Sequence, residues 1–368
     1  MHIIIFLLVL AVLIFVHELG HFVMARAFGI RVDEFALGFG PKIYSKKVMS
    51  AKHGETAYSL NLIPFGGYVK IFGENPDEDS LKGPDAKRSF VNKPKYVQAA
   101  VLVAGVIFNF LFAWAIFGAV FMAGFPASTD SYPEYASRIT DNRVLITSVA
   151  ADKPAAAAGI KPGDELVNAD GSAVSVTDFQ NRINASGGKP VAISYKHLDL
   201  MSTATVIPTT GIIEGRYGIG IQMSEAGTLK LPIHLAIWEG GRLVIDMIQQ
   251  TAVGIYNLIA TSLGGKGSLS SVTGIVGIEG MVKDATDMGF SHLLAFVALI
   301  SINLGVLNLV PFPALDGGRL LFVIIEAVSR RSIKPSVANA INAVGFCILI
   351  LLMVVVTWHD IATRWFVK

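Results

Sequence analysis

The sequence predicts a polytopic α-helical membrane protein with four transmembrane helices, a membrane-associated β-hairpin and one separate polar domain of the α+β type. Three observations lead to this prediction. Of the 368 residues, 52% are hydrophobic and 16% are charged, whereas about a quarter of a soluble protein is charged. Several apolar runs reach the roughly 20 residues that a bilayer-spanning helix needs. One polar stretch between them is long enough to form a small domain.

Four apolar segments are expected to span the membrane. They are residues 1–27, 97–125, 293–327 and 337–360. The first has neither a basic start nor a small-residue cleavage site after its apolar part, so we interpret it as a retained helix rather than a secretory signal. The third is interrupted by prolines at 311 and 313 and by glycines at 317 and 318. A break at membrane depth is tolerated only beside protein or a water-filled cavity, so this segment is expected to line a site.

The first apolar segment contains the pattern His17-Glu18-Leu-Gly-His21. Positions four apart share one face of a helix, so two imidazoles point to the same place with a carboxylate beside them. This arrangement suits a zinc ion, a water and a general base. Ionisable groups are costly in hydrocarbon, which makes them functional candidates by default. The alternative is two histidines that bond neighbouring helices, with Glu18 as their partner.

A catalytic zinc site needs a third protein ligand and an open position. The best candidate is Asp316 in the broken third segment, because a carboxylate oxygen suits zinc beside two imidazoles. The glycines that follow it would let the backbone approach the metal closely. The alternative is that Asp316 caps the helix that resumes at Gly317. The one cysteine, Cys347, excludes a thiolate zinc site, and the net charge of +2 excludes nucleic acid as an expected partner.

Residues 28–96 form neither a spanning helix nor an ordinary loop. The stretches 34–44 and 56–72 have the residue types of strands, and residues 73–96 are polar and rich in turn residues. Gly38 and Gly40, on either side of Phe39, would let another backbone come close. We interpret the region either as a plain hairpin on the cytoplasmic side or as a sheet edge beside the site, where an unfolded substrate strand pairs.

Residues 126–224 form the polar domain. Strands are expected at 144–149, 165–170, 191–195 and 204–208, with short helices at 154–160 and 177–185. The alanine-rich helix followed by Gly-Ile-Lys-Pro-Gly-Asp-Glu-Leu resembles a PDZ domain of the bacterial type. That resemblance implies a groove between a strand and a helix that accepts peptide ends. The alternative is another small α/β domain with a Pro-Gly-Asp turn.

Residues 225–292 are amphipathic and rich in glycine turns. Their apolar positions suit a helix on or near a membrane surface. They equally suit packing against the PDZ-like domain, and the sequence does not separate these alternatives.

The distribution of charge predicts an orientation. The 28–96 loop carries more Lys and Arg than Asp and Glu, the 328–336 turn carries three basic residues, and the 126–224 domain is acidic. Short loops rich in Lys and Arg stay in the cytoplasm. The first loop and the last turn are therefore expected to face the cytoplasm, and the PDZ-like domain and both termini to face outward.

The two halves of the site together resemble the site-2 protease family of intramembrane zinc metalloproteases, and more closely its bacterial RseP-type members. The resemblance covers nearly the whole chain and rests on a PDZ domain after the second span and on four motifs. They are the H-E-x-x-H of the first span, Gly38-Phe-Gly-Pro41, Pro64-Phe-Gly-Gly-Tyr68 and Asn308-x-x-Pro311-x-Pro313-x-Leu-Asp316-Gly. The chain departs from the family pattern at Val106, where members usually have proline.

The resemblance implies regulated intramembrane proteolysis with one catalytic Zn²⁺, in a multi-pass protein of the bacterial inner membrane. The metal ligands would be His17, His21 and Asp316, with Glu18 as the general base. Asn308 would steady the substrate backbone or the oxyanion, or alternatively would only tie two helices together. The residues expected to bind substrate are Gly38, Phe39, Gly40, Pro311 and Pro313.

The expected partners are transmembrane proteins or peptides as substrates, the lipid bilayer, and peptide ends at the PDZ groove. The substrates would be regulators such as anti-sigma factors, or remnant signal peptides. Two other classes of function remain as alternatives. A zinc or proton transporter also places ionisable groups in broken helices, but would be expected to show inverted repeats. A membrane-anchored PDZ adaptor would need no intramembrane ligands.

Overall fold

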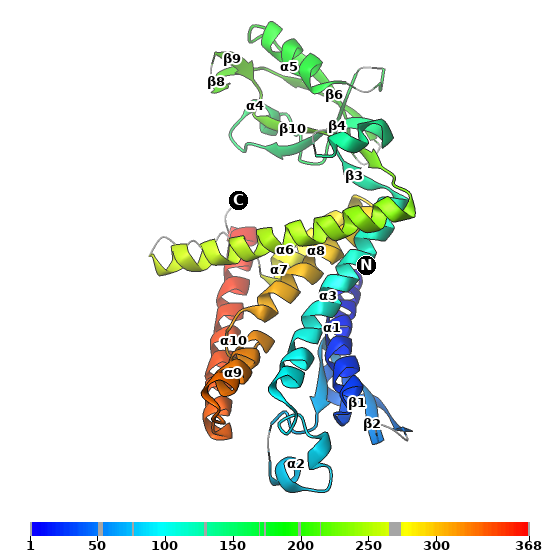
Figure 1. The fold of residues 1–368 in the computed structure, drawn as a ribbon. Helices are drawn as coiled ribbons and strands as arrows, with labels where there is room; N and C mark the ends of the chain where they lie inside the picture. The colour runs from blue at the N-terminus through cyan, green and yellow to red at the C-terminus, as the bar shows by residue number, and fades with distance from the viewer. Residues whose placement is uncertain are drawn as a thin grey trace. The chain divides into compact units, whose positions relative to one another are not determined.

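The structure is a computed structural model that describes residues 2–50, 54–75, 77–128, 131–168, 170–172, 174–197, 200–213, 215–264 and 274–366. The chain forms two compact units (Figure 1). One comprises Met1–Gly118 and Ile237–Lys368, and the other comprises Ala119–Ala236. The first unit contains the hairpin and most of the apolar helices, and the second contains the polar domain.

The helices that lie wholly or mainly in the first unit include the zinc-motif helix, which carries His17, Glu18 and His21, and the two halves of the interrupted third apolar segment. They are α1 (His2–Ala27), α2 (Glu78–Lys82), α3 (Lys95–Ala123), α6 (Ile233–Leu263), α7 (Ile275–Asp287), α8 (Phe290–Leu309), α9 (Asp316–Ser329) and α10 (Pro335–Phe366), with a 3-10 turn at Ala86–Arg88.

Among the described residues, five helices are long and apolar enough to cross a membrane, where the sequence predicts four spans. They are His2–Ala27, Lys95–Ala123, Ile233–Ser262, Phe290–Leu309 and Pro335–Ala362. The addition is α6, in the region expected to be amphipathic, of which residues 265–273 lie outside the described part. Glu239, Arg242 and Asp246 make α6 the least apolar of the five, which is why composition alone did not single it out.

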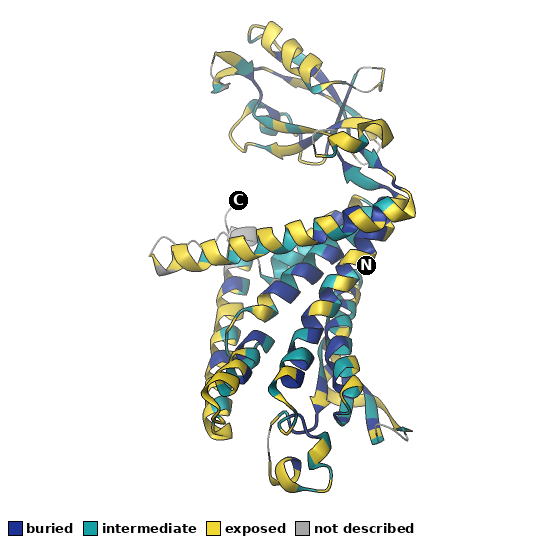
Figure 2. Cartoon of the chain, viewed as in Figure 1, coloured by how far each residue is buried: buried dark blue, intermediate teal, exposed yellow. Residues whose placement is uncertain are grey.

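The five candidate helices differ in their arrangement and exposure. In Figure 1, α6 runs across the other helices of its unit instead of alongside them. Figure 2 shows that α10 exposes most of its length. Its exposed side chains include Val344, Phe346 and Leu351, at 61%, 57% and 64%. Apolar side chains that are exposed on a spanning helix are suited to contact lipid. The predicted third span consists of α8, a break at residues 310–315, and α9.

Helices α1 and α3 approach each other closely because both have glycine at the crossing. A Cβ added at Gly20 would lie 2.4 Å from the carbonyl oxygen of Ala104, and one added at Gly105 would lie 2.5 Å from Nε2 of His21. On α8, a Cβ at Gly305 would lie 2.6 Å from the ring of Phe110. Small residues let membrane helices pack backbone against backbone. The zinc-motif helix is therefore held tightly against α3.

We expect Gly20→Ala to lower the midpoint of thermal unfolding by about 1–4 °C, because overpacking costs about 1–3 kcal/mol. The measurement is a thermal melt of the purified protein in detergent micelles. Gly254→Ala on α6 is the control, since a Cβ there meets nothing within 4 Å. Equal midpoints for the two variants would show that α1 and α3 are not packed this closely.

The predicted hairpin is present as β1 (Val32–Ser50) and β2 (Gly54–Ile71). Residues 34–37 of β1 pair on both edges, with 57–60 and with 67–70, so β2 doubles back between these stretches. Burial opposes ionisation of Glu34, but hydrogen bonds from Lys42 and Ser59 hold the pKa of this carboxyl below its ordinary value. The hairpin thus has a defined register although its distal part is exposed.

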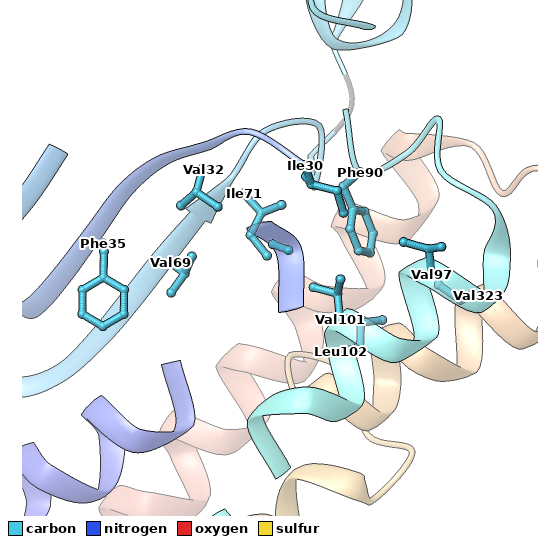
Figure 3. Close-up of a cluster of buried hydrophobic side chains, with 11 residues drawn as sticks. Ile30, Val32, Phe35, Val69, Ile71, Phe90, Val97, Val101, Leu102 and Val323 are labelled. Carbon is cyan, nitrogen blue, oxygen red and sulfur yellow. The ribbon is translucent and has the colours of Figure 1, made fainter. Parts of the chain in front are cut away.

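A cluster of buried apolar side chains joins the hairpin to α1, α3 and α9 (Figure 3). It comprises Ala25, Ile30, Val32, Phe35, Val69, Ile71, Phe90, Val97, Val101, Leu102 and Val323. Because both strands contribute to this core, β2 is fixed beside the helix that carries the zinc motif.

The second unit is a six-stranded antiparallel sheet in the order β3-β10-β4-β5-β6-β7, with a separate pair β8-β9. The strands are β3 (Phe125–Ala127), β4 (Ile139–Val149), β5 (Glu165–Val167), β6 (Val191–His197), β7 (Leu200–Val206), β8 (Thr209–Ile213), β9 (Arg216–Gly218) and β10 (Ile221–Leu229). The helices are a 3-10 helix at Pro133–Arg138, α4 (Pro154–Ala157) and α5 (Val176–Ala185). All the predicted elements are present with shifted ends, and α5 packs into the core through Phe179 and Ile183.

Candidate metal centre

The two histidines of α1 lie on its buried face. His17 and His21 are each 7% exposed, and their Nε2 atoms are 3.2 Å apart. This proximity follows from their spacing of four residues on one helix. The pattern in the sequence therefore brings two imidazole nitrogens together, as predicted.

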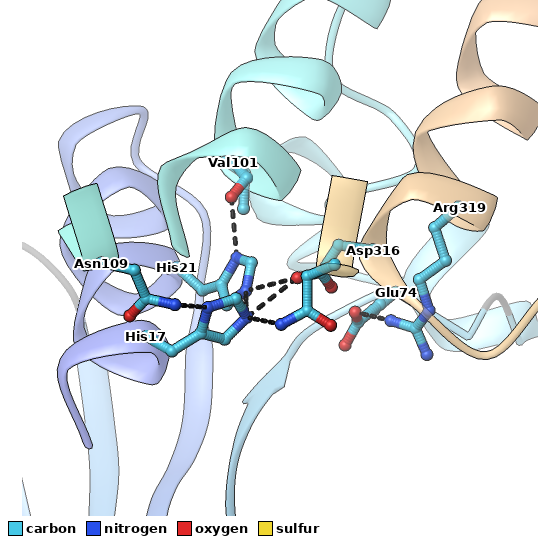
Figure 4. A network of polar contacts seen from close by, with 8 residues as sticks. His17, His21, Glu74, Val101, Asn109, Asp316 and Arg319 are labelled. Carbon is cyan, nitrogen blue, oxygen red and sulfur yellow. Dashed lines mark hydrogen bonds and ion pairs between the residues drawn. The ribbon is translucent and has the colours of Figure 1, made fainter. Parts of the chain in front are cut away.

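Asp316 reaches both rings from the first turn of α9 (Figure 4). One carboxylate oxygen lies 2.9 Å from Nε2 of His17 and 3.3 Å from Nε2 of His21. In a tetrahedral site with zinc–ligand distances of about 2.0–2.2 Å, neighbouring ligand atoms are about 3.3–3.6 Å apart. The three candidate ligand atoms lie within 4.8 Å of one another. The donor types and their spacing thus fit one zinc ion.

The alternative that Asp316 caps α9 is wrong. The N-cap residue is Leu315, and no side-chain hydrogen bond caps the helix. The two glycines also have a role within the fold, while their close approach to a metal stays a prediction. A Cβ at Gly317 would lie 2.3 Å from the carbonyl oxygen of Val310, and one at Gly318 would lie 2.2 Å from that of Phe312. The glycines make room for the carbonyls of the break, which is how α9 can restart beside it.

The break between α8 and α9 is supported by α10. The backbone N–H of Ala314, whose φ is +74°, donates to Oδ1 of Asn342 at 3.3 Å. A Cβ at Gly345 would lie 2.4 Å from Cβ of Pro313, so this proline packs directly on α10. The irregular backbone of the break is thus supported by α10 on one side, while its residues are half-buried and Pro311 is exposed. Contact of Pro311 and Pro313 with substrate stays a prediction.

The two predicted catalytic side chains lie next to the candidate ligands. Glu18 is half-buried and lies near the backbone of Val69 in β2. A Cβ at Gly67 would lie 3.7 Å from Cγ of Glu18, so β2 runs past this carboxylate. Nδ2 of Asn308 lies 3.5 Å from Nε2 of His17, at the limit of a hydrogen bond.

Two groups on α3 contact the histidines and were not singled out from the sequence. Nδ1 of His21 donates to the carbonyl oxygen of Val101 at 2.8 Å. The side-chain amide of Asn109 lies 3.1 Å from Nδ1 of His17 and is fully buried. The sequence shows only that Val101, Gly105 and Asn109 are spaced by four and so share one face of α3, and not that this face meets the histidines.

Gly38 and Gly40 have φ values of +80° and +87° and lie where β1 changes its pairing. The backbone that approaches Gly38 belongs to the hairpin itself. A Cβ there would lie 2.4 Å from the carbonyl oxygen of Ile63, and Nδ2 of Asn61 donates to the Gly38 oxygen at 2.9 Å. Phe39 is 48% exposed. The expected close approach is therefore present, but its partner is internal, and substrate contact stays a prediction.

Two ion pairs tie α9 to the loop that follows β2 and to α3. Arg319, one turn after Asp316, pairs with Glu74 (Figure 4), and Lys95 pairs with Glu326 at 2.5 Å. These four residues line a cavity of about 400 Å³. The end of α9 that carries Asp316 is thus held in place by the Lys- and Arg-rich loop that follows β2.

The family of this chain follows from a comparison with known sequences. The sequence model of peptidase family M50 matches residues 5–352. This chain belongs to peptidase family M50. This is the site-2 protease family, so the resemblance seen in the sequence is confirmed. The protein is a zinc-dependent intramembrane metallopeptidase with several membrane helices.

The relatives of this M50 peptidase include proteins from several bacteria. A candidate zinc metalloprotease of Clostridium perfringens is 36% identical over 364 residues, which cover 98% of each chain. Another, from Rhizobium meliloti, is 31% identical and covers 97% of this chain and 95% of its own. The regulator of sigma-W protease RasP of Bacillus subtilis is 29% identical and covers 97% of each chain.

Solved structures that are similar to part of the chain include a PDZ domain. The crystal structure of the PDZ domain of an SdrC-like protein from Listeria monocytogenes is 34% identical and covers 23% of this chain and 90% of that domain, with a TM-score of 0.21.

Proposed function

We propose that this M50 peptidase performs regulated intramembrane proteolysis on single-span membrane proteins. The substrates in this proposal are membrane-tethered regulators or remnant signal peptides. The observation that carries the proposal is the meeting of His17, His21 and Asp316, from two apolar segments almost 300 residues apart, beside the carboxylate of Glu18. Ionisable side chains are rare in membrane-spanning segments, and this set of groups is suited to hydrolysis there.

Each side chain has a role in this proposal. His17, His21 and Asp316 hold one zinc ion, which when bound acts as a Lewis acid and lowers the pKa of a water. Glu18 takes a proton from the attacking water and passes it to the leaving amine. Asn308 donates a hydrogen bond to the scissile carbonyl oxygen as negative charge develops there.

The hairpin presents the substrate in this proposal. A transmembrane helix hides its peptide bonds, so the substrate must be unwound before attack. The stretch 67–70 of β2 runs past Glu18 and pairs on one edge with β1. An unwound segment can add to its other edge by main-chain hydrogen bonds. Gly38, Phe39, Gly40, Pro311 and Pro313 are proposed to contact that segment.

We place the enzyme in the bacterial inner membrane, with the zinc site towards the cytoplasm and the PDZ-like domain outside. The basic 28–96 and 328–336 segments support this orientation. In the second unit, the sheet beside α5 is of a kind that accepts peptide ends by strand addition, which supports a role as a substrate filter. Membership of a peptidase family favours this function over a transporter or an adaptor.

Removal of zinc tests the proposal. The full-length protein is reconstituted in phospholipid vesicles with a single-span membrane protein, before and after treatment with a chelator. We expect cleavage inside or next to the spanning segment, its loss on chelation, and its return with about one equivalent of Zn²⁺. Mass spectrometry locates the cleaved bond. Cleavage only in soluble tails, or full activity in protein stripped of zinc, would contradict the proposal.

A further inference from the structure

One face of α3 contacts both histidines. Val101, Gly105 and Asn109 follow one another at intervals of four, so they lie in a line along the helix. The line runs past His21 and His17, with Val101 at the first ring and Asn109 at the second. Gly105 lies between them, where a Cβ would come within 2.5 Å of His21 and 2.8 Å of His17. The missing side chain lets the flanking polar groups reach the rings.

A histidine that binds a metal through Nε2 carries its proton on Nδ1, and that proton needs an acceptor. For His21 the acceptor is unambiguous, because the carbonyl oxygen of Val101 can only accept, at 2.8 Å. Both candidate ligand nitrogens are Nε2 atoms facing Asp316, so His17 has the same requirement. Among the described residues, its Nδ1 has one hydrogen-bond partner, the side-chain amide of Asn109 at 3.1 Å.

The carboxamide of Asn109 can meet this requirement with its oxygen. Its nitrogen is the atom placed beside His17, while its oxygen is buried and has no hydrogen-bond partner among the described residues. The two ends of a carboxamide have nearly the same shape, so their assignment follows from the hydrogen bonds around them. A protonated Nδ1 and an N–H₂ group cannot bond each other. Nothing in the described structure holds the oxygen where it is, so a half-turn of the amide satisfies His17.

We infer that Asn109 is a positioning residue of the zinc site, which accepts the Nδ1 proton of His17 through its side-chain oxygen and so fixes the tautomer that presents Nε2 to the metal. The inference rests on the proposed role of His17 as a ligand. It gives the two histidines matching supports on one helix, a backbone carbonyl for His21 and an amide oxygen for His17. If Asn109 only linked α3 to α1, a hydrogen bond through either its oxygen or its nitrogen would serve.

Two substitutions that keep the branching of the side chain at Cγ separate these roles. Asn109→Leu removes the acceptor, and Asn109→Asp keeps an oxygen in its place. We expect the zinc affinity of the full-length protein in micelles, measured by competition with a chromophoric chelator, to fall about 10–100-fold in the first and to stay within about threefold of wild type in the second. The Co²⁺ absorption bands should change only in Asn109→Leu.

The control is Asn303→Leu, which removes another interhelical hydrogen bond, from Thr251 Oγ1 to Asn303 Oδ1 at 2.8 Å. We expect its zinc affinity to equal that of wild type. Equal affinities for Asn109→Leu and wild type, or equal losses in Asn109→Leu and Asn109→Asp, would overturn the inference. If Asn109→Leu does not fold, ¹⁵N NMR of histidine in the zinc-loaded wild type decides, since a proton on Nε2 of His17 would also overturn it. A wild type that holds no zinc would instead contradict the proposed function.

Discussion

Glu18→Gln is expected to lower the rate of peptide-bond cleavage by about 10²–10⁴-fold while zinc remains bound, because an amide cannot take the proton from the attacking water. Glutamine has almost the same shape as glutamate, so the packing of α1 should be preserved. The side chain is not one of the three candidate ligand groups, which is why metal content should stay near one zinc per chain. The measurements are cleavage of a single-span substrate and zinc analysis of the same preparation.

The matched control for this prediction is Glu78→Gln, the same change at an exposed position in the first turn of α2. It should cleave at the wild-type rate. Wild-type activity in Glu18→Gln would remove Glu18 from the mechanism. Loss of zinc from Glu18→Gln would mean that the carboxylate supports the metal rather than the proton transfer.

Asp316→Ala is expected to abolish cleavage and to weaken zinc binding by at least about 100-fold. It removes one of three protein ligands, a larger change than loss of an outer hydrogen bond, which typically costs 10–100-fold. The substitution does not remove a helix cap from α9, because Asp316 makes no capping hydrogen bond. Chelator competition measures the affinity, and circular dichroism checks that the helices remain.

Asp316→Glu tells whether the position of the oxygen matters as well as its chemistry. The longer side chain keeps a carboxylate but cannot place it 2.9 Å from His17 and 3.3 Å from His21 without movement of α9. We expect intermediate affinity and little activity. Normal zinc binding in Asp316→Ala would show that the third ligand lies elsewhere.

The residues proposed to carry the chemistry were predictable because they form local patterns. His17, Glu18 and His21 need only one helix to be brought together, and helical spacing fixes their relation. Asp316 could be paired with them because a carboxylate in a broken apolar segment is rare enough to require a partner. The hairpin and the strands of the polar domain were likewise predictable from alternation and turn residues, although their ends shifted.

The supports of the site were not predictable in the same way, because they depend on where separate helices cross. Asn109 and Val101 lie on an apolar helix with no charged residue near them, and only the crossing at Gly20 and Gly105 brings them to the histidines. The doubled pairing of β1 and the internal partner of Gly38 depend on how β2 folds back. The charged residues near the start of α6 lower its mean hydropathy, so the sequence alone did not identify it as a fifth apolar helix.

The sequence by itself determined the types of the candidate ligands, their division between two apolar segments and the membrane character of the chain. These follow from periodicity and from the cost of placing ionisable groups in hydrocarbon. Only the tertiary structure decided which nitrogen of each histidine faces Asp316, that the glycines after Asp316 accommodate the break, and which residues of α3 support the rings. The physical reason is that these relations are contacts of 2–4 Å between segments distant in sequence, and no local pattern fixes their distance or direction.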